Sequence, residues 1–410
     1  MSELLEKAEK ALAHDLCDHC LGRLFAHVDT GLSDRERGES IRMALQFTRV
    51  LEDKEPLPPH VKCSICDEIF EMVPRFADSV VERLQGLEFD TFLIGTRVDP
   101  LLAEKEERLW SEVGQDTAET IKAELNQEIG KAVQARIPQE VEFATPDVVA
   151  LVDTRFCHVE LDISPLFVYG RYRKLSREIP QTRWPCNRCR GKGCSKCGGT
   201  GKMYQTSVQE LIGDPMQRDA QGTDHFFHGM GREDIDARMV GNGRPFVLEV
   251  RDPSKRHVDL LAIQSEINEV GRERVEVEGL RPSSREEVRQ VKLASPDKEY
   301  RARVLFESKV NKEQLDEVIQ SLKRIRITQQ TPTRVSHRRA DLAREREIRD
   351  LVLEEFDGSS ATLRVRTESG TYVKEFVHGD SGRTVPSLAG KLGIACSVEW
   401  LDVIEIADQN

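Results

Sequence analysis

The first half of the chain changes between helical and strand spacing of its apolar positions. In "LSDRERGESIRMALQFTRVLE" (32–52), apolar residues recur at helical intervals, and Ser33 before Asp34 and Glu36 is typical of a helix start. The pattern predicts that residues 1–50 are helical and that residues 68–165 alternate helix and strand. Helices are expected at 77–87 and 117–133, and strands at 89–96, at 141–154 as two short strands, and at 158–170.

The second half shows mostly strand patterns with helices between them. "TSVQELIGDP" (206–215) opens with Ser207 and Glu210 three residues apart, which is the spacing of a capping box. Most connections are short enough for antiparallel pairing, so the pattern predicts an α+β domain with a mixed, mainly antiparallel sheet. Strands are expected at 244–250, 274–280, 299–308, 361–367 and 398–406, and helices at 258–270, 311–324 and 383–393.

Between these halves, residues 170–204 have no periodicity but contain two cysteine pairs. We therefore predict three parts: an N-terminal domain over 1–165, a basic Cys-rich connecting segment over 166–204, and a C-terminal domain over 205–410. No apolar run approaches the ~18 residues that span a bilayer. The start, "MSELLEKAEKAL", is a charged amphipathic helix and not a signal peptide, so a cytoplasmic protein without membrane contact is expected.

The net charge of −12 is unevenly distributed. Residues 170–204 hold ten Lys or Arg and one acid, and residues 323–349 hold nine Lys or Arg and three acids. Two basic stretches on an acidic body favour phosphate contacts, although each could instead be a solvated face. In the second stretch, the arginines at 338, 344 and 349 fall at mixed helical spacings, so they cannot all face one groove.

Eight of the ten cysteines form Cys-x-x-Cys pairs, which in a cytosolic chain indicate thiolate metal ligation. Two such pairs can close one tetrahedral zinc site, and a structural role is expected because no open position is evident. Cys157 and Cys396 are expected in the core. The predicted metal ligands are Cys17, Cys20, Cys63 and Cys66 for one site, and Cys186, Cys189, Cys194 and Cys197 for the other.

Three segments of the C-terminal half carry candidate chemistry. "GREDIDARMVGNGRPF" (231–246) places carboxylates beside arginines ahead of an expected Gly-Asn-Gly turn and a strand, as a site holding one ionised carboxylate would require. A solvated loop would tolerate the same composition. The other two are "DKEYRARVLF" (297–306) and "ESGTYVKEFVHGDSGRTVPSLAGKLG" (368–393).

These segments resemble the shared motifs of pseudouridine synthases. The resemblance implies that Asp234 is the catalytic carboxylate, that Tyr300 stacks on the target base, and that Lys374 pairs with the aspartate. It implies also that Val373 packs beside the tyrosine. Asp236 is a rival for the catalytic role, but the shared Arg-x-Asp pattern favours Asp234.

Longer stretches are similar to the archaeal and eukaryotic tRNA pseudouridine synthases that act on the TΨC arm. These are "VYGRYRKLSREIPQTRWPCNRC", "HGMGREDIDARMVGNGRPF", "TPTRVSHRRADLARERE" and "GTYVKEFVHGDSGRTVPSL", and the likeness is strongest over 168–393. It implies a THUMP-containing, zinc-binding N-terminal domain and isomerisation of uridine 54, uridine 55 or both. It implies structural zinc, no organic cofactor, tRNA as the partner, and no obligate protein partner.

The expected contacts to tRNA come from the basic stretches and from the motifs, and Trp184 is expected to stack. Two alternatives remain open. One is a non-catalytic zinc-containing tRNA-binding protein, and the other is a THUMP-type thiolase or methyltransferase, for which no nucleotide-binding or S-adenosylmethionine motif is found. The expected contact residues are Arg171, Arg173, Lys174, Arg183, Trp184, Arg232, Arg334, Arg338, Arg339, Val373 and Arg383.

Overall fold

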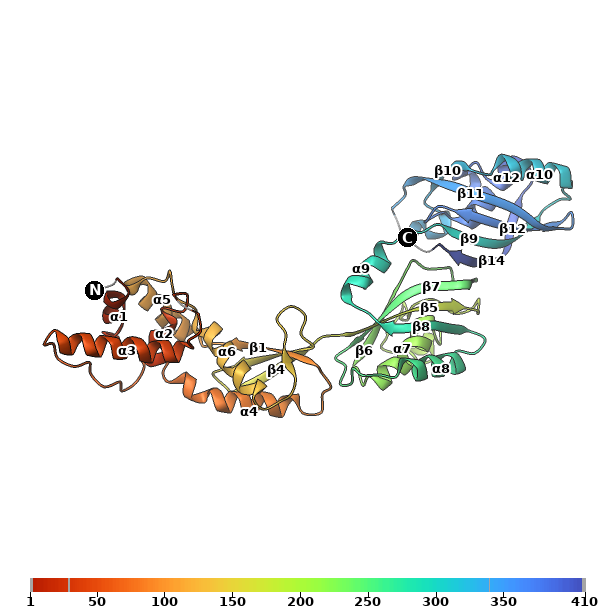
Figure 1. Cartoon of the computed structure of the whole chain (residues 1–410). Coiled ribbons are helices and arrows are strands. Elements are labelled where there is room, and N and C mark those ends of the chain that lie inside the picture. Colours follow the sequence, from red (N-terminus) through yellow and green to blue (C-terminus); the bar gives the residue numbers. More distant parts are fainter. Residues whose placement is uncertain (1–2, 29, 339, 408–410) are drawn as a thin grey trace. The chain divides into compact units, whose positions relative to one another are not determined.

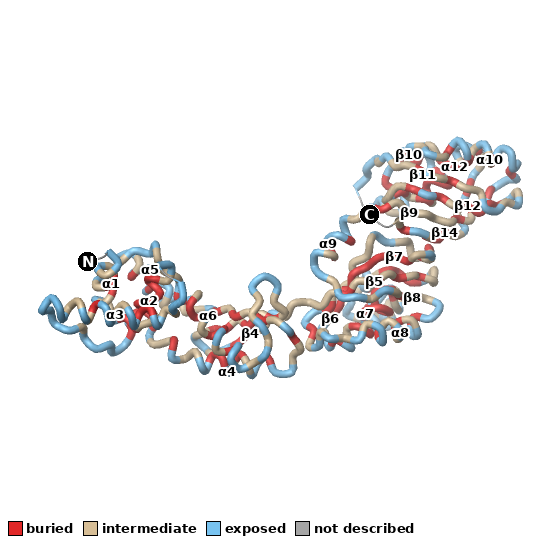
Figure 2. Tube along the Cα trace, viewed as in Figure 1, coloured by how far each residue is buried: buried red, intermediate tan, exposed pale blue. Residues whose placement is uncertain are grey.

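The computed structural model describes residues 3–28, 30–338 and 340–407 of the chain. It divides into two compact units (Figure 1). Unit 1 comprises Met1–Ser164 with Ser254–Arg256, and unit 2 comprises Pro165–Pro253 with His257–Asn410. In both, buried residues follow the sheets and the inward faces of the helices (Figure 2).

Unit 1 packs helices on one face of a small sheet and continues into a helical N-terminal part. The sheet has the order β2–β1–β3–β4, with β1 parallel to β2 and β3 and with β4 antiparallel to β3. Its strands are β1 (Thr91–Arg97), β2 (Glu140–Val141), β3 (Val148–Asp153) and β4 (His158–Ile163). Its helices are α1 (Glu3–Ala11), α2 (Asp18–Arg23), α3 (Asp34–Leu51), α4 (Val73–Leu84), α5 (Pro100–Val113) and α6 (Ile121–Gln134), with a 3-10 turn at Ile69–Met72.

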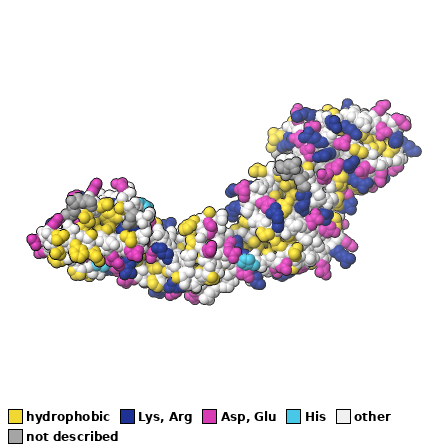
Figure 3. Space-filling model, viewed as in Figure 1, with side chains coloured by type: hydrophobic (Ala, Val, Ile, Leu, Met, Phe, Trp, Pro, Cys, Tyr) yellow, Lys and Arg dark blue, Asp and Glu magenta, His cyan; other side chains and the backbone are white. Residues whose placement is uncertain are grey.

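Helix α3 begins where the sequence predicts. Ser33 accepts a hydrogen bond from the Glu36 N–H, and the Glu36 carboxylate accepts one from the Ser33 N–H, which completes a capping box. Part of the apolar face of α3 is exposed to solvent: Phe47 is 65% exposed and Leu51 is 86% exposed. Hydrophobic side chains accordingly gather over α3 on the face drawn in Figure 3.

Unit 2 is built on one large sheet. Its strand order is β13–β10–β11–β12–β9–β14–β7–β5–β8, and β6 pairs with β7. All described pairings in this sheet are antiparallel except β14 with β7, so the predicted mixed, mainly antiparallel sheet is confirmed. The strands are β5 (Leu166–Lys174), β6 (Asp224–Gly229), β7 (Ala237–Arg251), β8 (Val275–Pro282), β9 (Lys298–Phe306), β10 (Ile325–Gln330), β11 (Ala343–Phe356), β12 (Ser360–Thr367), β13 (Thr384–Val385) and β14 (Cys396–Ile406).

Helices cover each half of this sheet and give it two cores. Buried residues of α7 (Val208–Asp219) and α8 (Leu260–Val270) pack with those of β5, β7 and β8. Buried residues of α10 (Lys312–Ser321), α11 (Val373–His378) and α12 (Leu388–Leu392) pack with those of β9 to β12. The remaining helical elements are α9 (Arg285–Leu293) and the 3-10 turns Ser195–Cys197, Thr333–Arg338 and Gly379–Gly382.

The structure corrects three predictions in this half. Residues 166–174, which we assigned to the connecting segment, form β5 inside the sheet, because Val168, Gly170, Tyr172 and Lys174 alternate towards the buried side. The arginines at 344 and 349 lie on strand β11 and not on a helix. The expected 383–393 helix is shorter, since residues 384–385 pair as β13 and α12 begins at residue 388.

The predicted Gly-Asn-Gly turn is also different. Gly241 and Gly243 have φ of 60° and 69°, and they lie inside β7, where the pairing with β5 shifts register. A Cβ on Gly241 would lie 1.8 Å from the Ile404 carbonyl oxygen, so only glycine fits there. The three residues therefore make a bulge that bends the strand and do not end it.

No helix of residues 3–28, 30–338 and 340–407 has the length and apolar character that crossing a membrane requires.

Helices α2 and α3 approach so closely that glycine is needed at their contact. A Cβ on Gly38 would lie 1.9 Å from the Asp18 carbonyl oxygen. We expect Gly38→Ala to lower the free energy of unfolding of unit 1 by about 1–3 kcal/mol, although alanine is the better helix former. Chemical denaturation followed by circular dichroism measures this change.

The matched control is Gly130→Ala, in the middle of α6. There the nearest atom to an added Cβ is an Ile94 side-chain carbon at 3.9 Å. This variant should be as stable as the parent or more so. Equal stability of the two variants would contradict the close approach of α2 and α3.

Candidate active site and metal centres

A short loop before β7 carries the predicted carboxylates, and a buried ion pair holds its start. Glu233 and Arg244 lie 3.0 Å apart, and each side chain is 1% exposed. Arg244 also donates to the Met230 carbonyl oxygen, while the Tyr172 hydroxyl donates to Glu233. Burial disfavours the charge on Arg244, but Glu233 together with Tyr172 and Tyr300 outweighs this effect and raises the pKa of Arg244. The Arg244 guanidinium therefore stays charged inside the protein.

Lys174 of β5 holds the same loop from the protein interior. Its Nζ donates to the carbonyl oxygens of Ile179, Asp234 and Ile235 at 3.2, 3.0 and 2.7 Å. We predicted that Lys174 contacts RNA, but the residue is fully buried. Lys174 lies on the inward face of β5, where its ammonium group donates to the loop carbonyl oxygens. The burial of the side chain lowers the pKa of Lys174 to about 8.

Asp234 lies next to two cations, and the nearer one is not the one predicted. Arg334 Nη1 is 3.0 Å from Asp234 Oδ2, whereas Lys374 Nζ is 3.7 Å from it. Lys374 lies closer to Asp236, at 2.7 Å. Two carboxylates and two cations thus form one cluster, in which Arg334 is the main partner of Asp234 and Lys374 bridges the two acids.

A further acid fixes Arg334. Glu375, which is 2% exposed on the side chain, lies 2.7 Å from Arg334 Nε. Burial works against the charge of Arg334, but Glu375 and then Asp234 outweigh it and raise its pKa. For the acid Asp236 the pKa shifts downwards: burial raises its pKa, but the neighbouring Lys374 outweighs burial and lowers it. Asp234 keeps 38% of its side chain exposed, so it is open to a ligand.

These groups line one cavity of about 540 Å³ in unit 2. Asp234, Lys374 and Arg334 lie on its wall together with Tyr300 of β9 and Val373 at the start of α11. Burial raises the pKa of Tyr300 to about 12, so its hydroxyl is neutral near pH 7. Residues more than 130 positions apart in sequence therefore converge on one space.

A second groove of about 350 Å³ shares part of this wall. It is lined by Arg232, Asp234 and Lys374, and also by Trp184 and Tyr204, whose rings meet edge to face at 5.6 Å. Arg232 is exposed and has no hydrogen bond or ion pair with a described residue. The groove thus offers aromatic rings and a free cation beside the cavity.

Several predicted RNA contacts have other partners in the structure. Arg171 donates to the carbonyl oxygens of Asn242 and Gly243, and Arg173 donates to that of Gly241, so both brace the bulge of β7. Arg183 pairs with Asp224, Arg383 pairs with Asp341, the side chain of Arg338 is not described, and Arg339 lies outside the described residues.

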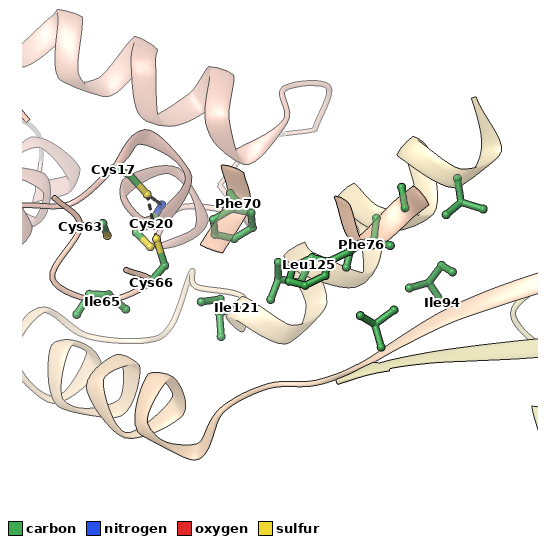
Figure 4. Packing of buried hydrophobic residues seen from close by; sticks show 14 of the residues in the cluster. Cys17, Cys20, Cys63, Ile65, Cys66, Phe70, Phe76, Ile94, Ile121 and Leu125 are labelled. Atoms are coloured by element: carbon green, nitrogen blue, oxygen red, sulfur yellow. Dashed lines mark hydrogen bonds between the residues drawn. The ribbon is translucent and has the colours of Figure 1, made fainter. Parts of the chain in front are cut away.

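The first cysteine cluster lies in the core of unit 1. Cys17, Cys20, Cys63 and Cys66 are at most 8% exposed, and Figure 4 shows them beside Ile65 and Phe70. Their sulfurs lie within 4.8 Å of one another, and Cys17 and Cys66 are 3.5 Å apart. Four thiolates around zinc, at about 2.3 Å each, give sulfur separations of about 3.8 Å. The donor set fits a closed four-thiolate site.

The second cluster lies nearer the surface. Cys186 is buried, whereas Cys189, Cys194 and Cys197 are partly exposed. The measured separations are 3.9 Å for Cys186–Cys194 and for Cys189–Cys197. The N–H groups of Cys194 and Gly201 both donate to Cys197 Sγ at 3.2 Å, as amides around a metal-bound thiolate do. This cluster also can hold a four-coordinate metal.

The sequence did not indicate Glu233, Arg244, Glu375 or Lys298 as parts of the site. Glu233 and Arg244 stood inside quoted motifs, but only their mutual burial reveals the ion pair. Lys298 begins the quoted strand and lines the cavity. A periodic pattern could have shown that it shares a strand face with Tyr300, since the two are two residues apart.

Comparison with known proteins follows the same division of the chain. Residues 167–407 match the family model described as "Pus10, C-terminal". Residues 76–153 match the model described as "Pus10 THUMP domain, archaeal".

Full-length relatives are also similar. The chain is 40% identical to the tRNA pseudouridine synthase Pus10 of Halorubrum lacusprofundi, covering 100% of this chain and 97% of that protein. It is 42% identical to the protein of the same name from Methanothrix thermoacetophila, covering 99% and 95%. A chain from a solved "Cbf5-Nop10-Gar1 Complex" has a TM-score of 0.32 and 16% identity, covering 57% of this chain and 47% of that one, which is too weak a likeness to carry an inference.

The loop cap formed by Lys174 leads to a stability prediction. In Lys174→Met the side chain keeps its length, but three buried carbonyl oxygens lose their donor. We expect the free energy of unfolding of unit 2 to fall by about 2–4 kcal/mol. Urea denaturation of the full chain measures the loss.

The control is Arg173→Met at the neighbouring position. Arg173 is partly exposed, and both its ion pair with Glu278 and its hydrogen bond to the Gly241 carbonyl lie at the surface, so its loss should cost less than about 1 kcal/mol. If Lys174→Met proved as mild as this control, the capping role would be excluded.

Proposed function

The chain belongs to the Pus10 family of tRNA pseudouridine synthases, and we propose that it uses Asp234 to isomerise uridine in the TΨC arm of tRNA, at position 54, position 55 or both. One observation carries this proposal: Asp234, Tyr300 and Lys374, which come from three distant segments, line one cavity. We propose in addition that Val373 packs against the base that enters there.

The reaction makes modest demands that this cavity meets. Isomerisation moves the link to the ribose from N1 to C5 of the same uracil, so it needs neither a redox partner nor a group donor. It needs an ionised carboxylate at the ribose and walls that keep the detached base in place. Arg334 lies 3.0 Å from Asp234, and the buried Glu375 keeps Arg334 in position, so a fixed cation faces the proposed catalytic group.

Access requires that the nucleotide leave its stack. A flipped base gains stacking on an aromatic ring, which repays part of the unstacking energy. Tyr300 offers that ring inside the cavity, and its neutral hydroxyl adds no charge there. We propose that Trp184 and Arg232 contact the nucleotides beside the flipped one, because they line the adjoining groove. The cations at 338, 339 and 383 remain proposed tRNA contacts on the evidence of the sequence motifs alone.

We propose that unit 1 binds tRNA, since its residues 76–153 match a THUMP domain model. Zinc is the metal that we propose for both cysteine clusters, with a structural role, because four thiolates leave no open position for a substrate. The cytoplasm, where tRNA is modified and thiols stay reduced, is the compartment that we propose.

Asp234→Asn tests the catalytic assignment. The amide keeps the size of the side chain but cannot act as a base or nucleophile. We expect release of tritium from 5-tritiated uridine in tRNA to fall at least about a thousandfold, with tRNA affinity within about threefold of the parent. Retained release would rule out Asp234 as the catalytic group.

Asp236→Asn is the matched control, two residues away in the same charge cluster. Because its side chain is 67% exposed and turned towards Lys374, we expect a loss of less than about tenfold. A non-catalytic tRNA-binding protein would instead show no release with any of the three proteins.

The target position is tested on an unmodified tRNA transcript. Mapping of pseudouridine at nucleotide resolution should find it at 54, 55 or both. The same mapping on transcripts with cytidine at one of these positions separates the two reactions. Pseudouridine only outside the TΨC arm would contradict the proposed substrate position.

The metal proposal predicts about two zinc ions per chain by elemental analysis. Cys63→Ser should remove one zinc ion and unfold the N-terminal part of unit 1, because its cluster is buried in that core. Cys194→Ser should remove the other and leave unit 1 resistant to proteolysis. Acid-labile sulfide with a visible charge-transfer band would replace zinc with an iron–sulfur cluster.

A further inference from the structure

One cation in the cavity has no role in the chemistry described so far. Lys298, the first residue of β9, lines the cavity, and its Nζ lies 3.1 Å from Ser369 Oγ. No carboxylate of the described residues lies within 4.0 Å of this ammonium group, unlike Lys374 and Arg334. Ser369 Oγ is the one hydrogen-bond partner of this half-buried ammonium among the described residues, so the group has donors left for a ligand.

The register of the sheet places Lys298 at the end of the cavity away from Asp234. The Asp234 carbonyl oxygen accepts a hydrogen bond from the Ala237 N–H, which closes a turn at the start of β7. Ala237 pairs with Leu401 of β14, and Leu401 pairs on its other side with Ala302 of β9. Two residues back along β9 is Tyr300, and two further back is Lys298. Each step is about 7 Å, so the order along the cavity is Asp234, Tyr300, Lys298.

The electrostatics agree with this order. Burial is the main influence on the pKa of both Tyr300 and Lys298. The charged neighbours that act next are Arg244 and Asp234 on Tyr300, and Arg244 and Asp297 on Lys298. Burial and the neighbouring Arg244 lower the pKa of Lys298 to about 8. At pH 7 the group is therefore mainly the ammonium form and can donate.

The shape of uracil determines which of its atoms would face Lys298. If the ribose C1′ lies at Asp234 and the ring stacks on Tyr300, the atom that points directly away from the ribose is O4, because C4 is opposite N1 in the ring. When the base is rejoined through C5, the atom opposite is C2, and O2 takes the same place. One donor at this end therefore meets a carbonyl oxygen before and after isomerisation.

We propose that Lys298 Nζ donates a hydrogen bond to the uracil carbonyl opposite the ribose, which is O4 in uridine and O2 in pseudouridine. This rests on the function proposed above. In the reaction the N1–C1′ bond breaks with its electron pair left on uracil, C5 bonds to C1′, and the C5 proton is lost as N1 gains one. The ammonium stabilises the negative charge that the carbonyl oxygens carry meanwhile, and it disfavours cytosine, whose position 4 bears an amino group.

The test is a double-mutant cycle between enzyme and substrate. Single-turnover rates are measured for the parent and Lys298→Met on tRNA with uridine or 4-thiouridine at the mapped target, since sulfur is a weak acceptor. We expect each change alone to slow isomerisation about ten- to a hundredfold, with tRNA affinity within about threefold. Lys298→Met acting on the 4-thiouridine tRNA should be little slower than either change alone, because both changes remove the same hydrogen bond between Lys298 and position 4 of the base.

Other outcomes are equally informative. If the two changes multiply, Lys298 does not contact position 4, and the proposal is wrong. Ser369→Ala removes the hydroxyl partner of Lys298 and should cost less than about threefold; a loss equal to that of Lys298→Met would make Lys298 a structural residue. Lys298→Arg should restore part of the rate. If the parent itself is inactive, the proposed function fails and not this assignment alone.

Discussion

The structure of the site depends on one buried ion pair, that of Glu233 and Arg244. Two charges that are each 1% exposed are costly to bury, and they are tolerated only because further donors and acceptors complete the set. The Tyr172 hydroxyl donates to Glu233, and Arg244 donates to the Met230 carbonyl oxygen. The Gln181 amide in turn donates to the Tyr172 oxygen. The pair joins the residue before Asp234 to the middle of β7, so the loop cannot shift without exposing or orphaning a charge.

This constraint leaves the Asp234 carboxylate open to the cavity. Its backbone is held by Lys174 from the protein interior, while its carboxylate, 38% exposed, meets Arg334 and Lys374 at the cavity wall. The cations belong to other segments and are themselves held, Arg334 by Glu375 and Lys374 by Asp236. A rigid backbone, with an open side chain that faces two fixed cations, is the arrangement that a preorganised carboxylate needs.

Sequence patterns predicted much of the fold. The spacing of apolar positions located α3 and most strands of the large sheet, and the motifs named three residues that the structure brings into one cavity. What failed depends on long-range partners. Arg334, 100 residues from Asp234, looked like another RNA-binding cation until folding placed it beside the carboxylate. Lys174 was predicted to be an exposed RNA contact, because a sequence does not show the three carbonyl oxygens to which its ammonium group donates.

The sheet register explains why residues so distant in sequence can line one small cavity. Strand β14 pairs with β7 on one side and β9 on the other, so it ties the loop of Asp234 to the strand of Tyr300. Alternate residues of β9 lie about 7 Å apart on one face of the strand, which spaces Tyr300 and Lys298 along the cavity wall. Backbone hydrogen bonds between the strands thus fix the relative positions of these residues. The bulge at Gly241–Gly243 belongs to the same arrangement, because it bends β7 just beyond the residues that pair with β14.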